Sequence, residues 1–223
     1  MKKGVAMAEG CKWADKSPIL QEYHDLEWGH PVVDSLELFE KLCLQCISAG
    51  SFKSGENNEF DIDSGQLSVI EARGLYREKF HNFDPNEMVK LTQKDIEQLV
   101  DEEKERQQKD SDSSFKGLCK NKQKLKALIT NASAYLEMEK NGENFSDFCW
   151  SFTKNKMILG GTNLKDIPSY ATEMSVELKK KGFSYTTPSV CYAFMQSVGI
   201  INDHSIDCPL RNDCIEEANI FGK

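Results

Sequence analysis

The chain has 223 residues, of which 29% are charged and 39% hydrophobic, values typical of a globular protein with a sizeable core. Its net charge of −8 argues against non-specific coating of nucleic acid, because phosphate binding requires clustered Lys and Arg. The apolar runs are too short to cross a bilayer, and MKKGVAMAEG lacks the apolar core of a secretory signal. We therefore expect an intracellular protein, cytoplasmic or nuclear and not secreted, whose eight cysteines are mostly thiols or metal ligands.

The spacing of apolar residues predicts helices along most of the chain. In residues 34–47 they recur every three or four positions, and Asp34 with Glu37 forms a capping box at the start. Further helices are predicted to begin at Asp84 and Pro85 and to span residues 92–100, 121–141 and 187–199. No stretch shows the sustained alternation of a half-buried strand, so the predicted fold class is all-α.

Two polar segments, residues 51–65 and 101–114, show no apolar face and are interpreted as solvated insertions in a single domain that spans residues 1–223. Five lysines follow the second segment within a short window: Lys116, Lys120, Lys122, Lys124 and Lys126. Such a basic patch is compatible with a small DNA footprint on an acidic protein. The alternative is a solvated start of a helix, because lysine runs commonly just face water.

Two pairs of Cys and His residues stand at opposite ends of the chain, Cys11 with His24 and His204 with Cys208. Two thiolates and two imidazoles form the ligand set of a tetrahedral structural zinc site. A metal held by all four would join the N-terminal and C-terminal segments. The alternative is a set of buried thiols and satisfied core histidines, and Cys214 could replace Cys208 as a ligand.

Several longer runs carry a family resemblance. The first is YHDLEWG at residues 23–29, with Cys11 and Trp13 upstream. The others are FHNFDP at 80–85, NASAYLEMEKNGENFSDFCWSF at 131–152 and KKKGFSYTTPSVCYAFMQSVGIINDH at 179–204. In these runs the chain resembles the DNA-3-methyladenine glycosylase I family of helix-hairpin-helix DNA glycosylases. Order and spacing agree from about Cys11 to Cys208, so the resemblance covers most of the chain.

The resemblance implies a monofunctional DNA repair enzyme. Such an enzyme flips an alkylated adenine, 3-methyladenine, out of damaged double-stranded DNA and hydrolyses its N-glycosidic bond with water. The resemblance also implies one structural Zn²⁺ on Cys11, His24, His204 and Cys208, without an open coordination position. Asp203 is expected to orient His204. We further expect a monomer with no membrane partner.

The family's base-binding set is altered in this chain. Family members use Tyr and Trp faces and one Glu to bind the cationic base. Tyr23 matches the stacking Tyr, although it could equally be a core aromatic. Gln45 stands at the Glu position; it keeps an acceptor but lacks the charge, and it is the candidate catalytic residue. At the Trp position Phe52 could stack, whereas Lys53 would repel a cationic base. The candidate substrate-binding residues are thus Tyr23, Gln45, Phe52 and Lys53.

The family's DNA-binding hairpin corresponds to residues 117–125. Gly117, Lys120, Lys122 and Lys124 are the candidates for holding the DNA backbone, and Gln123 replaces a later glycine of the family.

The altered residues leave a second interpretation open. With Gln45 and Lys53 in place, the chain could be a zinc-containing DNA-binding relative whose catalytic activity is weakened or lost. A zinc-dependent hydrolase is disfavoured, since four protein ligands would leave no position for water.

Overall fold

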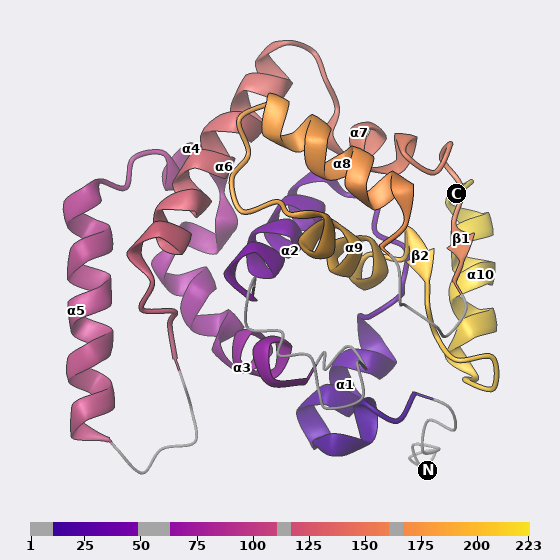
Figure 1. Cartoon of the computed structure of the whole chain (residues 1–223), viewed down its shortest axis with the longest axis horizontal. Coiled ribbons are helices and arrows are strands. Elements are labelled where there is room, and N and C mark those ends of the chain that lie inside the picture. The colour runs from indigo at the N-terminus through magenta and orange to yellow at the C-terminus, as the bar shows by residue number, and fades with distance from the viewer. Residues whose placement is uncertain (1–10, 49–62, 111–116, 161–166) are drawn as a thin grey trace.

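The computed structural model describes residues 11–48, 63–110, 117–160 and 167–223, with only the backbone of residues 63–66. Within these ranges the chain is mostly helical (Figure 1). The helices are α1 (Pro18–Leu26), α2 (Ser35–Ser48), α3 (Asp63–Lys79), α4 (Pro85–Met88), α5 (Gln93–Lys109), α6 (Lys122–Lys140), α7 (Phe145–Ser151), α8 (Ser169–Lys180), α9 (Pro188–Ser197) and α10 (Leu210–Ile220). Two 3₁₀ turns, η1 (Ala14–Lys16) and η2 (His81–Phe83), precede α1 and α4. The predicted helical fold class is confirmed.

Local capping signals set where several helices begin, as the sequence predicts. The Asp34 carboxylate accepts the backbone N–H of Glu37 at 2.8 Å before α2. The side chains of Asp84, Asn121 and Thr187 cap α4, α6 and α9 in the same manner. Each satisfies an N–H group that has no partner within its helix.

Helix α5 corrects one prediction. The segment 101–114 was expected to be a loop, yet α5 continues from Gln93 through Lys109. Glu, Lys, Arg and Gln favour helix, and pairs such as Lys104–Asp101 at 2.9 Å add support along the exposed face. A high density of charged residues is therefore no argument against a helix here. Of the other predicted insertion, residues 63–65 begin α3.

Helix α2 lies at the centre of the fold, surrounded by α3, α6, α7 and α9 (Figure 1). Nine of its fourteen residues are buried, so it presents apolar side chains to neighbours on several sides. Its Cys43 and Cys46 are core thiols, and burial raises the pKa of both. Trp150 of α7 is fully buried nearby and donates its indole N–H to the Val32 carbonyl at 2.9 Å.

One short parallel pairing joins the two strands, β1 (Ile158–Leu159) and β2 (Ile201–Asn202), with Ile158 opposite Ile201. Strand β2 leads into the last helix, and this C-terminal segment lies on the same side of the molecule as α1 (Figure 1). The contacts between residues 11–29 and 204–208 described below hold these two segments together.

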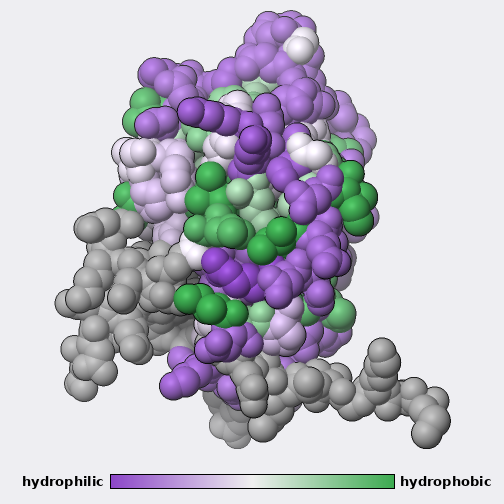
Figure 2. Space-filling view, turned by 90° about the vertical axis from the view of Figure 1, so that its right-hand side faces the viewer, coloured by the Kyte–Doolittle hydropathy of each residue, from purple (hydrophilic) through white to green (hydrophobic). Residues whose placement is uncertain are grey.

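The face that carries α10 and β1 is largely hydrophilic with scattered apolar patches (Figure 2). Its exposed large apolar side chains include Leu159, Ile220 and Phe221. None of the helices in the described ranges combines the length and apolarity that crossing a bilayer requires.

Candidate functional site

Four buried side chains from the two ends of the chain meet in one group, hereafter the Cys/His cluster: Cys11, His24, His204 and Cys208. The His204 Nδ1 atom lies 3.7 Å from Cys11 Sγ, 3.5 Å from Cys208 Sγ and 3.2 Å from His24 Nε2. Cys208 Sγ is 3.6 Å from His24 Nε2. Metal bonds of about 2.0–2.3 Å in a tetrahedron place the ligand atoms about 3.3–3.8 Å apart. The cluster can therefore hold a four-coordinate metal ion.

The two thiols of the cluster respond differently to their surroundings. Burial opposes the charged form of Cys11, but hydrogen bonds from His204 and His24 outweigh burial and lower the pKa of Cys11 to about 5. Burial, followed by the charge of Cys11, raises the pKa of Cys208 to about 11. Two neighbouring thiolates thus need a compensating cation, which a bound metal ion would supply.

The run YHDLEWG builds one wall of the cluster. Beyond its ligand atom, His24 places Nδ1 2.7 Å from Asp25 Oδ1, the arrangement in which a carboxylate fixes the ring of a metal ligand. On the other histidine, Nε2 of His204 lies 3.1 Å from the Trp28 carbonyl oxygen. Gly29 has φ +84°, and a Cβ there would lie 2.5 Å from His204 Nε2. Only glycine lets the backbone approach this closely.

The structure overturns one expectation about the surroundings of the cluster and one alternative ligand. Asp203 does not orient His204; its Oδ2 atom accepts hydrogen bonds from the Tyr192 hydroxyl and the Gln196 amide, each at 2.7 Å. Cys214 does not replace Cys208, because it is buried outside the cluster. The orienting carboxylate is Asp25, which directly follows its histidine in the sequence.

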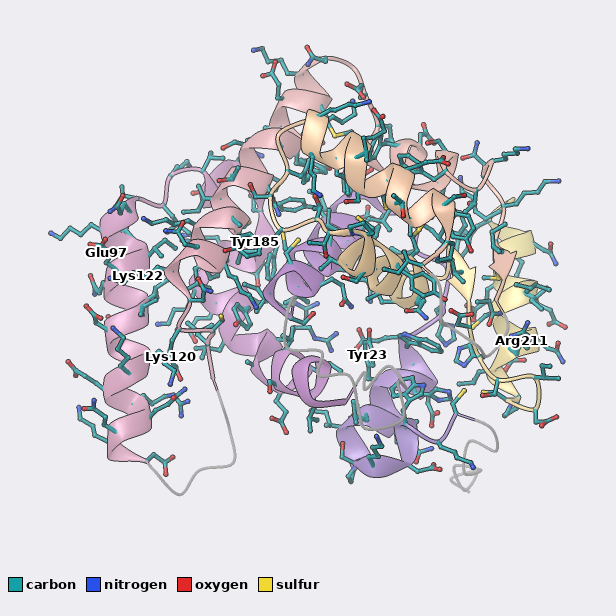
Figure 3. The ribbon with its side chains drawn as sticks, in the orientation of Figure 1. Tyr23, Glu97, Lys120, Lys122, Tyr185 and Arg211 are labelled. Carbon is teal, nitrogen blue, oxygen red and sulfur yellow. The ribbon has the colours of Figure 1, made fainter. Side chains whose placement is uncertain are left out.

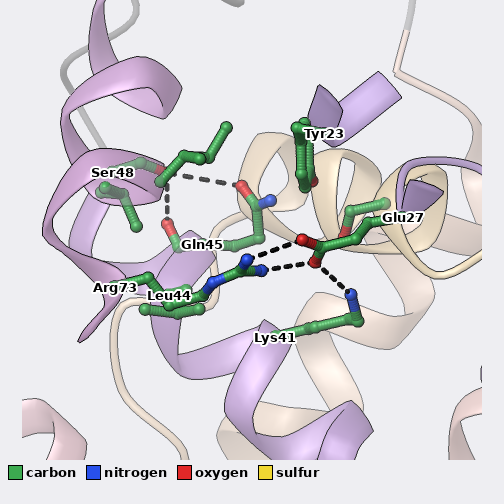
Figure 4. A pocket seen from close by; sticks show the side chains of 10 residues that line it. Tyr23, Glu27, Lys41, Leu44, Gln45, Ser48 and Arg73 are labelled. Atoms are coloured by element: carbon green, nitrogen blue, oxygen red, sulfur yellow. Dashed lines mark hydrogen bonds and ion pairs between the residues drawn. The ribbon is translucent and has the colours of Figure 1, made fainter. Parts of the chain in front are cut away.

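A pocket lies beside the cluster, between α1, α2, α3 and α9 (Figure 4). Its lining residues are Tyr23, Glu27, Lys41, Leu44, Gln45, Ser48, Val69, Ile70, Arg73 and Ser197. Tyr23 therefore connects the two sites, since the next residue in the chain is a member of the cluster. The backbone N–H groups of Glu27 and Trp28 both donate to the Tyr23 carbonyl, at 3.0 and 2.9 Å, and this turn ends α1 with Glu27 at the pocket.

An ion-pair network forms the charged side of the pocket (Figure 4). Arg73 donates to both carboxylate oxygens of Glu27, with Nη2 at 2.6 Å from Oε1. Lys41 Nζ lies 3.3 Å from Glu27 Oε2 and 3.7 Å from the exposed Glu37. Burial opposes the charge of Glu27, but the Arg73 hydrogen bonds and the Lys41 charge outweigh it and lower the pKa of Glu27. The three pocket-lining charges leave one net positive charge.

Gln45 and Tyr23 occupy the uncharged side of the pocket, with the Gln45 amide pointing into the space near the Tyr23 ring (Figure 4). The Ser48 hydroxyl contacts the Gln45 carbonyl oxygen at 2.9 Å and its side-chain Oε1 at 3.4 Å. Burial and the Glu27 charge raise the pKa of Tyr23, so its hydroxyl stays neutral. This side offers an aromatic face and an amide to a planar ligand.

The predicted DNA contacts lie in the segment before α6, residues 117–121, and in the first turn of α6. Lys120 Nζ donates to Gln107 Oε1 of α5 at 2.5 Å, and both Lys120 and Lys122 lie on the α5 side of the molecule (Figure 3). Lys124 turns the other way and donates to the Ile47 carbonyl at the end of α2, at 2.8 Å. Lys120 and Lys122 are thus better placed than Lys124 to meet a ligand from solution.

Comparison with known proteins identifies the family. A family described as methyladenine glycosylase matches residues 13–212, which is most of the chain. The chain belongs to the methyladenine glycosylase family. It is 39% identical over 209 residues to the DNA-3-methyladenine glycosylase of Haemophilus influenzae, with 92% of this chain and 99% of the relative covered. It is 36% identical over 204 residues to DNA-3-methyladenine glycosylase 1 of Escherichia coli, with 90% and 95% covered.

A solved structure of this family agrees with the fold. The structure that describes 3-methyladenine recognition by 3-methyladenine DNA glycosylase I from Staphylococcus aureus superposes with a TM-score of 0.74. The two proteins are 27% identical, and the comparison covers 92% of this chain and 98% of the other. The resemblance predicted from the sequence is therefore confirmed.

The pocket of this methyladenine glycosylase family member contains residues that the sequence analysis did not single out. Glu27 and Lys41 could have been found, because they lie four positions from Tyr23 and Gln45, on the same helix faces. Arg73 comes from a different helix and gives no local signal. Phe52 and Lys53, the other predicted substrate-binding residues, lie outside the described residues.

Proposed function

We propose that the protein is a DNA-3-methyladenine glycosylase that hydrolyses the N-glycosidic bond of 3-methyladenine in DNA. The observation that carries the proposal is the pocket, where Tyr23 and Gln45 lie side by side in a chain of this family. A base inside a duplex cannot reach such a pocket, so the nucleotide is flipped out of the stack first. The same chemistry makes the protein a base excision repair enzyme.

Two of the described pocket residues contact the base in this reaction. The Tyr23 ring stacks on the flipped base, and Gln45 forms hydrogen bonds with its edge. The alkylated base is cationic and leaves readily, so Gln45 acts by holding the base rather than by transferring a proton. Phe52 and Lys53 remain predicted members of the same set.

Water is the nucleophile in this proposal, and the enzyme is monofunctional. A lysine attacks the sugar only as a neutral amine. Among the described residues, Lys41 lines the pocket, and the carboxylates of Glu27 and Glu37 hold its Nζ atom at 3.3 and 3.7 Å. It is therefore unsuited to form a Schiff base.

The Cys/His cluster is proposed to hold one structural Zn²⁺ on Cys11, His24, His204 and Cys208. The donor set, the ligand-atom distances and the shift of the Cys11 pKa support this assignment. When bound, the ion would neutralise the two thiolates and join the N-terminal segment to β2 and α10. All four ligands come from the protein, which fits a closed site.

Damaged double-stranded DNA is the proposed partner. Four residues between α5 and the start of α6 would contact it in a hairpin of helix-hairpin-helix type: Gly117, Lys120, Lys122 and Lys124.

We also propose that residues 1–223 form one monomeric domain that works inside the cell, where its substrate is located. One shared hydrophobic core, to which α2, α3, α6, α8 and α9 all contribute, supports the single domain.

The test is release of 3-methyladenine from alkylated duplex DNA, measured by chromatography. The native chain is expected to release the base, and Tyr23→Ala is expected to lower the rate by about tenfold or more because the stacking surface is lost. Phe221→Ala removes a half-exposed aromatic ring outside the pocket and serves as the control. No release by the native chain, with DNA binding retained, would favour the inactive DNA-binding relative.

A further inference from the structure

A buried carboxylate lies on α5, far from both the pocket and the Cys/His cluster. Glu103 is only 4% exposed, although α5 is otherwise covered with exposed charges. Charged side chains are rarely buried to this degree unless other groups are arranged to pair with them. The groups that pair with Glu103 therefore indicate what it does.

The partners of Glu103 come from its own helix and from the segment 117–121. Arg106 donates to Oε1 through Nη2 at 2.7 Å, and Gln107 donates to the same oxygen at 2.7 Å. The backbone N–H of Leu118 also bonds to this carboxylate. One buried side chain thus ties the end of α5 to the residues that precede α6.

Gly117 shows how closely the two segments pack. Its φ is +63°, and a Cβ at this position would lie 2.4 Å from Glu103 Oε1 and 2.5 Å from Arg106 Nη2. The peptide at Gly117 therefore rests directly on the ion pair. A side chain would be excluded both by the backbone conformation and by the contact.

Two further hydrogen bonds hold Cys119 and Lys120, the next residues of the segment. The Cys119 N–H donates to the hydroxyl of Tyr76, a buried residue of α3, at 2.8 Å. Lys120 Nζ is held by Gln107, the same side chain that donates to Glu103. Residues 117–120 are thus bound from Gly117 to Lys120 by groups of α5 and α3.

From this geometry we propose that Glu103 is a positioning residue for DNA binding: with Arg106 and Gln107 it holds the hairpin segment 117–121 so that Lys120 and Lys122 meet the phosphates. The inference rests on the proposed DNA-binding function of this segment. It assigns a role to the charged second half of α5.

The test compares Glu103→Gln with Glu105→Gln in the full chain. Both changes remove one negative charge from α5, but Glu105 is 70% exposed and pairs only loosely with Lys109, at 3.8 Å. Binding to undamaged duplex DNA is measured by fluorescence anisotropy across salt concentrations. Glu103→Gln is expected to weaken binding about five- to tenfold and to lower the salt slope by about one, because a phosphate contact is lost. Glu105→Gln is expected to stay within about twofold of the native Kd.

A second readout separates positioning from general damage. At saturating enzyme, the single-turnover rate of base release should match the native rate in both variants, since the pocket is untouched. Hydrogen exchange at Leu118 and Cys119 should accelerate only in Glu103→Gln. If that variant does not fold, Gln107→Ala removes the link to Lys120 and is tested in the same way.

The outcomes distinguish this inference from the proposed function beneath it. If Lys120→Gln with Lys122→Gln weakens DNA binding while Glu103→Gln binds and exchanges like the native chain, the positioning role is refuted. If the double lysine variant binds DNA with native affinity and salt slope, the hairpin assignment fails, and the positioning role with it.

Discussion

The Cys/His cluster and the pocket both use residues of the run YHDLEWG, but they differ in burial and in the kinds of side chains that they contain. The cluster is dry: its four side chains are 0–3% exposed, and their donor atoms converge on one point. The pocket is partly open and mixes an uncharged side, formed by Tyr23 and Gln45, with the ion pairs of Glu27. We therefore expect a change in the cluster to act mainly on folding, and a change in the pocket to act on binding of the proposed base.

The two sites also differ in what a single substitution would remove. A metal site needs all its ligands at once, because one missing thiolate or imidazole leaves the others without a shared centre. A pocket can exchange a carboxylate for an amide, as at Gln45, and lose part of its attraction for a cation without losing its shape. We therefore expect substitution of a cluster ligand to abolish metal binding, and substitution at Gln45 to change the strength of base binding.

The largest effect is expected from breaking the cluster. Cys208→Ser should lower the free energy of unfolding by at least about 3 kcal/mol, or the Tm by about 10 °C, because metal binding contributes to folding. Elemental analysis should find one zinc per native chain and little in the variant. Cys119→Ser, at a thiol outside the cluster, is the matched control. Native zinc content in Cys208→Ser would contradict the ligand assignment.

The second prediction tests the close packing of Gly29 against His204 without removing a ligand of the cluster. Gly29→Ala places a Cβ against the His204 ring at positive φ and should cost about 2–3 kcal/mol of unfolding free energy, measured by urea denaturation. Gly74→Ala is the control: it lies within α3 with no atom within 4 Å of the new Cβ, and it should be neutral or stabilising by up to about 1 kcal/mol. Equal effects of the two changes would show that the contact with His204 does not matter.

The smallest effect concerns the charge of the pocket. Lys41→Met leaves Glu27 paired with Arg73 alone and removes the net positive charge that opposes a cationic base. The single-turnover rate of 3-methyladenine release at an enzyme concentration below the Kd for DNA should rise about two- to fivefold, since partly exposed charges interact weakly. Lys90→Met, at an exposed lysine of the α4–α5 connection, is the control. A slower rate in Lys41→Met would mean that this lysine assists binding.

Most of the fold could be predicted from the sequence, because caps and apolar spacing are local signals. Asp84, Asn121 and Thr187 each begin a helix where predicted. The second half of α5 was missed because its face is charged, and helix formation there depends on side-chain pairs and on the burial of Glu103. A charged side chain is buried only where other groups pair with it, and some of these groups come from elsewhere in the chain. A local sequence pattern therefore does not predict the burial of Glu103.

The site residues also differ in whether the sequence alone can predict them. Residue type makes the four residues of the Cys/His cluster candidate ligands, and the family resemblance selects them as one set. Asp25 was missed in favour of Asp203, since adjacency to a histidine was considered only at one end of the chain. In the pocket Tyr23 and Gln45 were identified through the family resemblance, whereas Arg73 pairs with Glu27 across 46 positions and could not be predicted from spacing.

The most direct test of the central claim, that Gln45 limits the activity while the scaffold is intact, is the single-turnover rate of 3-methyladenine release by Gln45→Glu. A carboxylate restores a charge-assisted bond to the cationic base, so the rate at an enzyme concentration below the Kd for DNA should rise about tenfold or more over the native chain. Gln98→Glu makes the same charge change on the exposed face of α5 and should leave the rate unchanged. A Gln45→Glu rate equal to or below the native rate would contradict the claim.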